Sequence, residues 1–112
     1  MTDPTAFKGF IAHQDGCVVV IITGDVDLTA VAPFSDVLAC AIEASPRVVL
    51  DMADVTFLDS SGLRVLASGA LAVGDAGSVT IRHAPPHVVR VLAVSGLEKV
   101  LTMESIDSSS ET

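Results

Sequence analysis

The sequence predicts a single α/β domain with a mostly parallel sheet of four to five strands, an N-terminal antiparallel hairpin strand and three main helices. Three observations lead to this fold class. Apolar segments alternate along the chain with amphipathic segments that have helical spacing. The apolar segments lack the polar alternation of a half-exposed strand, which is typical of buried parallel strands. With 112 residues, half of them hydrophobic, the chain is long enough for one core and too short for two.

The N-terminal part predicts a hairpin. Residues 7–12 form a short mixed segment, and Asp15-Gly16 in HQDGC is a turn signal that leads into CVVVIITG. The run from Cys17 to Ile22 is apolar without alternation. We therefore expect this second strand in the middle of a sheet that is covered on both faces.

The first helix is expected at about residues 30–43. Thr29 is a candidate cap, and Pro33 is tolerated because it falls near the first turn. Its apolar stripe, at spacings of three and four, comprises Val31, Phe34, Leu38, Ala41 and Ile42, which leaves Asp36, Cys40 and Glu43 on the outer side. Pro46 ends the segment before a third apolar strand, at 48–52.

A second helix is expected at about residues 60–73 and is closed by the glycines at 74 and 77. Its buried face is predicted to hold Leu63, Leu66, Ala67, Ala70 and Val73, and its outer face Ser61, Arg64, Val65 and Ser68. A fourth strand follows at 78–83. PPHVVRVLAVSG predicts a third helix, begun by proline and ended by Gly96, before a last short strand at 100–103.

These elements assign the domain to residues 1–104. The C-terminal stretch 105–112 has few apolar groups and several acids, so we predict a disordered tail. Strands and helices in alternation imply right-handed crossovers and a mostly parallel sheet. Periodicity leaves open whether the three helices lie on one face of the sheet or on both.

Charge and composition narrow the class of protein. Fourteen acidic against six basic residues give a formal net charge of −8, which argues against binding of nucleic acid and favours a basic protein partner. No apolar run approaches the roughly 20 residues of a membrane span, and residues 1–12 lack the build of a secretory signal, so we expect a cytoplasmic protein. Cys17 and Cys40 match neither a disulfide framework nor a zinc pattern, and reduced thiols are expected.

The segment TFLDSSGLR, residues 56–64, places an acid and two hydroxyls between an apolar strand and a helix. The carboxylate of Asp59 can accept a hydrogen bond from the N–H of Ser61 or Gly62 at the positive end of the helix. Capping accounts for the acid but for neither serine, because alanine is the stronger helix former. A first-turn hydroxyl is also a candidate phosphate acceptor, since the free N–H groups there tolerate a dianion.

Three fragments occur in order over residues 17–101: GDVDLTAVAPF, VVLDMADVTFLDSSGLRVL and PPHVVRVLAVSGLEKVL. Together they resemble the STAS domains of bacterial anti-sigma factor antagonists, also called anti-anti-sigma factors. FLDSSGL is the most specific of the matching segments. The resemblance implies a STAS-type fold in a small cytoplasmic regulator that has no catalytic activity and no cofactor of its own.

The resemblance also implies partners. Antagonists of this family bind an anti-sigma factor that is a serine kinase of the histidine-kinase-like ATPase class, and thereby free a sigma factor for transcription. The kinase, which carries ATP and magnesium, phosphorylates the serine after the aspartate of DSSG, and a serine phosphatase reverses the reaction. By position, the phosphoacceptor of this chain is Ser60. We expect a monomer that contacts neither nucleic acid nor membrane.

The partner-binding residues carried over by position or placed beside Ser60 are Asp27, Asp59, Ser60, Ser61, Gly62, Arg64 and Val65. Asp27 matches the family's acid at a strand end beside the phosphorylation site, so Asp27 and Asp59 are predicted to form an acidic rim around Ser60. Arg64, one turn later, is a candidate partner for the phosphate or simply a solvated residue. One departure concerns the first helix. The family commonly reads Asp-Leu-x-Thr-Ala-Pro there, whereas this chain has its threonine one place early and its proline one place late.

Other interpretations have less support. A STAS scaffold or adaptor of another signalling or transport complex would not be regulated through Ser60. A hydrolase with Ser60 as nucleophile lacks both a GxSxG elbow and a base within sequence reach. His83 and His87 have metal-like spacing, but two prolines separate them and no clustered acid or cysteine completes a site, so surface histidines are expected.

Overall fold

A computed structural model describes residues 5–104 and confirms the predicted fold class. The five strands, which form one sheet in the order β1-β2-β3-β4-β5, are β1 (Lys8–Gln14), β2 (Cys17–Val26), β3 (Arg47–Leu58), β4 (Ser78–Arg82) and β5 (Thr102–Met103). The helices are α1 (Val31–Ala44), α2 (Ser60–Val73) and α3 (Pro86–Ser95), with short 3-10 turns η1 (Leu28–Ala30), η2 (Gly74–Ala76) and η3 (Leu97–Lys99). The predicted tail, 105–112, lies outside the described residues.

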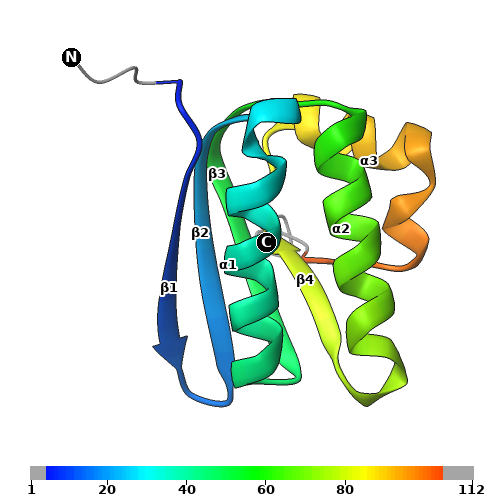
Figure 1. Cartoon of the computed structure of the whole chain (residues 1–112). Helices are drawn as coiled ribbons and strands as arrows, with labels where there is room; N and C mark the ends of the chain where they lie inside the picture. The colour runs from blue at the N-terminus through cyan, green and yellow to red at the C-terminus, as the bar shows by residue number, and fades with distance from the viewer. Residues whose placement is uncertain (1–4, 105–112) are drawn as a thin grey trace, which may run out of the picture.

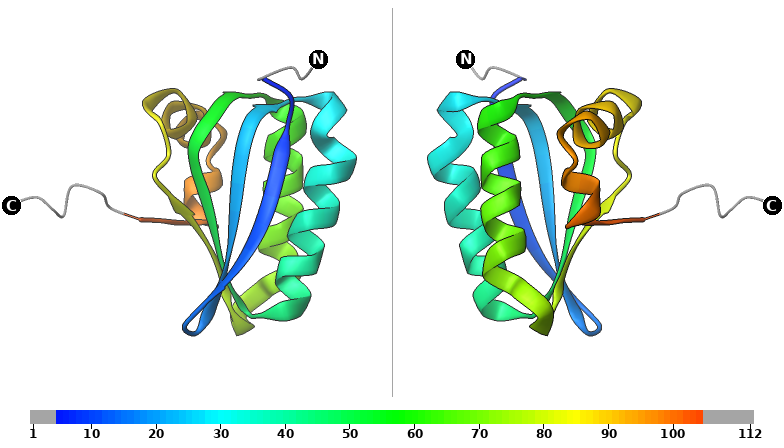
Figure 2. Two further views of the ribbon diagram at one scale, coloured as in Figure 1. Left: turned by 90° about the vertical axis from the view of Figure 1, so that its left-hand side faces the viewer. Right: turned by 90° about the vertical axis from the view of Figure 1, so that its right-hand side faces the viewer.

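The sheet is mixed as predicted. β1 pairs with β2 as an antiparallel hairpin whose turn holds Gly16 at φ 77°, and the other neighbouring strands are parallel. In Figure 1, α1 and α2 lie side by side in front of the sheet, and the two views in Figure 2 show β1 at its outer edge. Because β2 and β3 are parallel, their C-terminal ends lie next to each other at one end of the molecule.

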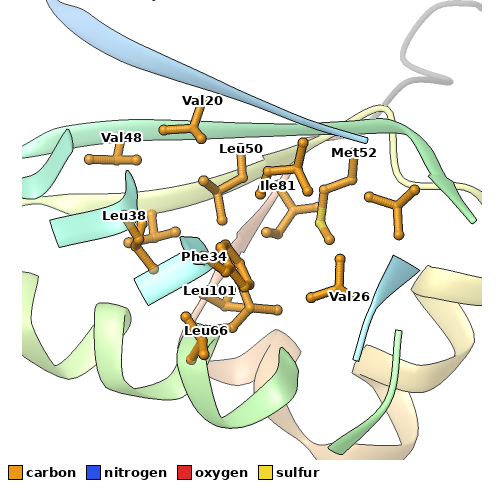
Figure 3. Packing of buried hydrophobic residues seen from close by; sticks show 14 of the residues in the cluster. Val20, Val26, Phe34, Leu38, Val48, Leu50, Met52, Leu66, Ile81 and Leu101 are labelled. Carbon is orange, nitrogen blue, oxygen red and sulfur yellow. The ribbon is translucent and has the colours of Figure 1, made fainter. Parts of the chain in front are cut away.

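One hydrophobic cluster joins all three helices to one face of the sheet. It includes Phe34 and Leu38 of α1, Leu66 of α2, and Val88 and Leu92 of α3. These side chains meet alternate residues of the strands, among them Val20, Val48, Leu50, Met52 and Ile81 (Figure 3). The same cluster includes Val18, Ile22 and Val79. Period-2 alternation sends these strand side chains to one face, so the buried side chains of the three helices converge on that face.

The opposite face corrects in part the expectation that β2 is covered on both sides, because Val19 on that face is 2% exposed whereas Ile21 is not buried. Phe10 and Ile21, which are paired across β1 and β2, remain 56% and 38% exposed. Within residues 5–104 no helix contributes a buried side chain to that face. The apolar run of β2 is thus not sufficient to indicate a helix on each side.

Three predicted boundaries need correction. β3 is twelve residues long rather than five, because its second half continues to pair with β2 up to Leu58 opposite Val26. The pairing of β2 with β3 shifts register twice, between Ile21 and Thr23 and between Gly24 and Asp25. These shifts interrupt the regular pattern of apolar residues, so the sequence did not indicate the longer strand. The last strand is Thr102–Met103 rather than 100–103. Thr29 is not the cap of α1, since Asp27 caps η1 and α1 follows after that turn.

Candidate functional site

The candidate site lies where β2 and β3 end side by side. Val26 is paired with Leu58, and the backbone N–H of Asp59 donates to the carbonyl oxygen of Val26 at 3.3 Å. Asp27 and Asp59 are each the first residue after their strand. Two acids that are 32 positions apart in the sequence therefore leave neighbouring strands at the same end of the molecule (Figure 1).

The start of α2 is capped as the sequence predicts. Asp59 has an extended backbone, at φ −121° and ψ −170°, and its Oδ1 accepts from the N–H of Ser61 at 2.9 Å and of Gly62 at 3.4 Å. The N–H of Leu63 donates to the Asp59 carbonyl oxygen at 3.1 Å, which is the first turn of hydrogen bonding in the helix. Ser60 is the first helical residue and is exposed, whereas Ser61 is half-buried.

Gly62 lets the helix start pack against both strand ends. A Cβ at this position would lie 2.6 Å from the Leu58 Cδ1 and Val26 Cγ1 atoms, and 3.1 Å from the carbonyl oxygen of Val26. Any larger residue would push the first turn of α2 away from the sheet. Gly62 is buried and has no side chain to offer a partner. Its close packing against Val26 and Leu58 instead holds Ser60 in place at the start of α2.

Val65 corrects a predicted position. It was expected on the outer face of α2 as an apolar contact for a partner, but it is buried, at 6% exposed. The reason is that α2 packs against α1 as well as against the sheet. At the helix crossing, a Cβ on Gly69 would lie 2.6 Å from Leu38 Cδ2 of α1. The buried arc of α2 is therefore wider than a single stripe.

Asp27 and a neighbouring acid that sequence reasoning did not assign, Asp25, are oriented by threonines. Asp27 Oδ1 accepts from the backbone N–H of Thr29 at 3.0 Å and from its hydroxyl at 2.6 Å. Asp25 Oδ1 accepts from the hydroxyl of Thr56 at 2.5 Å, across 31 positions in the sequence. The available signal for Asp25 was its place in GDVD, but its contact with Thr56 depends on the register between β2 and β3.

No basic side chain within residues 5–104 forms an ion pair with Asp25, Asp27 or Asp59. Arg64 is exposed and likewise forms no ion pair in this part of the chain. It follows Ser60 by four residues in the same helix, a spacing that puts both on one face. The site thus presents three carboxylates, an exposed hydroxyl and one unpaired guanidinium at one end of the molecule.

The described residues offer no clustered metal ligands. No group of three or more His, Cys, Asp or Glu side chains within 5–104 is arranged to hold an ion. His83, at φ 58°, places its Nδ1 3.2 Å from Asp51 Oδ2, and His87 lies in the first turn of α3. Cys17 and Cys40 are free thiols in the structure.

A family model described as Mlab, STAS domain, matches residues 10–103. The chain belongs to the STAS domain family. The matched range includes the site from Asp25 to Arg64 and runs to the end of β5.

Its relatives include anti-sigma factor antagonists. This STAS protein is 29% identical over 114 residues to the anti-sigma-F factor antagonist RsfB of Mycobacterium tuberculosis, covering 94% of this chain and 87% of the relative. An anti-sigma factor antagonist from Mycobacterium paratuberculosis has a similar structure, with a TM-score of 0.79, 26% identity and coverage of 96% and 94%. Unphosphorylated SpoIIAA, also an anti-sigma factor antagonist, has the same fold, with a TM-score of 0.69, 23% identity and coverage of 93% and 92%.

Phosphorylated SpoIIAA from Bacillus also shares the fold, with a TM-score of 0.66, 21% identity and coverage of 93% and 96%. The proteins that this STAS protein resembles are thus regulatory binding proteins, and anti-sigma factors are their targets by name. Among residues 5–104, every helix is too short or too polar to cross a lipid bilayer.

Proposed function

We propose that this STAS protein is an anti-sigma factor antagonist that binds an anti-sigma factor serine kinase, releases a sigma factor, and is switched off by phosphorylation of Ser60. The observation that carries the proposal is the exposed Ser60 hydroxyl at the first residue of α2, beside two acid-bearing strand ends. Similarity to the antagonist RsfB supports the class of partner. The protein itself acts by binding and is not an enzyme.

The proposed contact surface comprises Asp27, Asp59, Ser60, Ser61 and Arg64. Gly62 and Val65 do not contribute side chains to it, because both are buried. The carboxylates carry negative charge that no described base neutralises, so the surface suits basic groups on the kinase or its nucleotide-bound magnesium. The ATP and the metal belong to the kinase, and a serine phosphatase resets the switch.

The negative charge of a phosphate on Ser60 is the proposed cause of weaker kinase binding. A phosphate on Ser60 adds about −1.5 to −2 charge beside Asp59, on a surface whose acids have no basic partner within residues 5–104. If this costs roughly 3 to 4 kcal/mol of binding free energy, the affinity falls about 100- to 1000-fold. The antagonist need not refold, because the positive end of α2 stabilises the dianion where it forms.

The family model that matches is described by its STAS domain and not by sigma-factor control, which leaves a second candidate function. In that case the protein is a scaffold or adaptor of another signalling or transport complex, and Ser60 only begins α2. The two candidates differ in one measurable property, the response of binding to the chemistry of Ser60.

The test incubates the full chain with ATP and the serine-kinase anti-sigma factors of its own genome, and maps phosphate by mass spectrometry. Phosphate on Ser60, absent from Ser60→Ala, together with weaker kinase binding by Ser60→Glu, supports the antagonist. The matched control is Ser68→Ala, at an exposed serine two turns further along α2. Partner binding that ignores every Ser60 variant supports the scaffold, and ester hydrolysis abolished by Ser60→Ala would instead indicate a hydrolase.

A further inference from the structure

Two large apolar side chains are exposed beside the Ser60 site. Leu28, in η1, is 74% exposed and directly follows Asp27. Phe57, in β3, is 47% exposed and is paired in register with Asp25. Each lies within two residues of the paired strand ends Val26 and Leu58, so each is within roughly 10 Å of that edge along its chain.

From this arrangement we infer that Leu28 and Phe57 are the apolar anchors by which the protein docks on its partner, with the acids as the surrounding polar groups. The inference rests on the proposed function and identifies which side chains supply affinity. The occupant is an anti-sigma factor kinase whose docking face combines two apolar recesses with basic side chains.

Charge complementarity supports this occupant. Asp25, Asp27 and Asp59 have no basic partner within residues 5–104, and the whole chain has a net charge of −8. A second copy of the chain would bring the same uncompensated acids together, which is unfavourable. A basic partner neutralises them and can bury the two apolar side chains in the same contact.

The two kinds of contact have different physical roles. Desolvated aromatic and aliphatic side chains near the centre of an interface supply much of its affinity, whereas charged groups at its rim chiefly affect the association rate and the response to salt. Affinity from Leu28 and Phe57 therefore persists at high ionic strength. A phosphate on Ser60 opposes the part of the binding affinity that depends on charge.

The experiment measures the affinity of the full chain for a kinase that phosphorylates Ser60, by isothermal titration calorimetry at low and at high salt. Leu28→Ala and Phe57→Ala are each expected to weaken binding about tenfold or more at both salt concentrations. Asp27→Asn weakens binding mainly at low salt. The matched control is Leu71→Ala, at a leucine that is 81% exposed near the other end of α2, and it should change affinity less than about twofold.

Unchanged binding by both Leu28→Ala and Phe57→Ala, or an equal loss in Leu71→Ala, overturns the inference. Phe57→Leu replaces Phe57→Ala if the latter unfolds. If the wild-type chain is phosphorylated on Ser60 but the two variants bind normally, only the anchors are wrong. If no kinase binds or modifies the wild-type chain, the proposed function fails as well. A dimer of the free chain that dissociates in either variant would assign both side chains to self-association instead.

Discussion

The backbone N–H of Asp59 donates to the carbonyl oxygen of Val26 at 3.3 Å, and this contact ties the start of α2 to the end of β2. Asp59, which caps α2, is thereby held next to the end of β2, the strand that Asp27 follows. The exposed Ser60 hydroxyl sits on a rigid element as a result.

Asp59→Ala should lower the free energy of unfolding by about 1 kcal/mol, because the N–H groups of Ser61 and Gly62 lose their shared acceptor. Asp59→Asn, which keeps a capping oxygen, should lose only a small part of this. Urea denaturation measures both. Asp36→Ala, at an exposed acid on α1, serves as the control. Equal stability of Asp59→Ala and wild type would show that the cap is not stabilising.

Gly62→Ala should destabilise the fold by about 1 to 3 kcal/mol, since the added methyl would lie 2.6 Å from side-chain atoms of Leu58 and Val26. Thermal and urea unfolding provide the measurement. Ser68→Ala is the comparison within the same helix, and it should be neutral because Ser68 is exposed. A fully stable Gly62→Ala would mean that α2 can shift from the strand ends at little cost.

Phosphorylation of Ser60 should weaken kinase binding about 100- to 1000-fold, and phosphatase treatment should restore it. Ser60→Glu should weaken binding less, because a carboxylate adds one negative charge and phosphate adds about 1.5 to 2. Calorimetry with purified phosphorylated and unphosphorylated chains gives the ratio. Ser68→Glu adds the same charge away from the helix start, and an equal effect there would indicate general charge repulsion rather than a local switch.

Val65→Ala should lower stability by about 1 to 3 kcal/mol, because the side chain is only 6% exposed and its truncation leaves a cavity between helices. The matched control is Val94→Ala, at a valine that is 84% exposed on α3. Urea midpoints of the two variants give the comparison. If Val65→Ala weakens kinase binding without changing stability, Val65 contacts the partner after all.

Arg64→Gln should destabilise the phosphorylated chain by about 0.3 to 0.5 kcal/mol relative to phosphorylated wild type, and leave the unphosphorylated chain unchanged. The reason is that Arg64 lies four residues after Ser60 on the same helix and has no other ion pair within the described part of the chain. Urea denaturation of both forms tests this, with Arg90→Gln on α3 as the control. The same small change in both forms would make Arg64 a solvated helix residue.

Local signals in the sequence were sufficient to predict α2, α3 and the Asp59 cap, whereas the predicted Thr29 cap of α1 was wrong. The turn at Asp15-Gly16, the proline start and glycine end of α3, and the Asp59 cap are confirmed because their hydrogen bonds join residues within a few positions of each other. The pattern of DSSG likewise placed Ser60 at the first residue of α2.

Other features of the fold and the site depend on contacts between segments that are distant in the sequence. The length of β3, the Asp25–Thr56 hydrogen bond and the place of Phe57 beside Asp25 depend on the register between two strands that are distant in the sequence. The burial of Val65 depends on α1 packing against α2, which one helix's periodicity cannot indicate. The amino-acid sequence specified which chemical groups are present and where α2 and α3 begin, but it did not predict the η1 turn before α1. The packing of segments that are distant in the sequence determines which of those groups are exposed side by side on the surface, because it sets strand register and helix contacts.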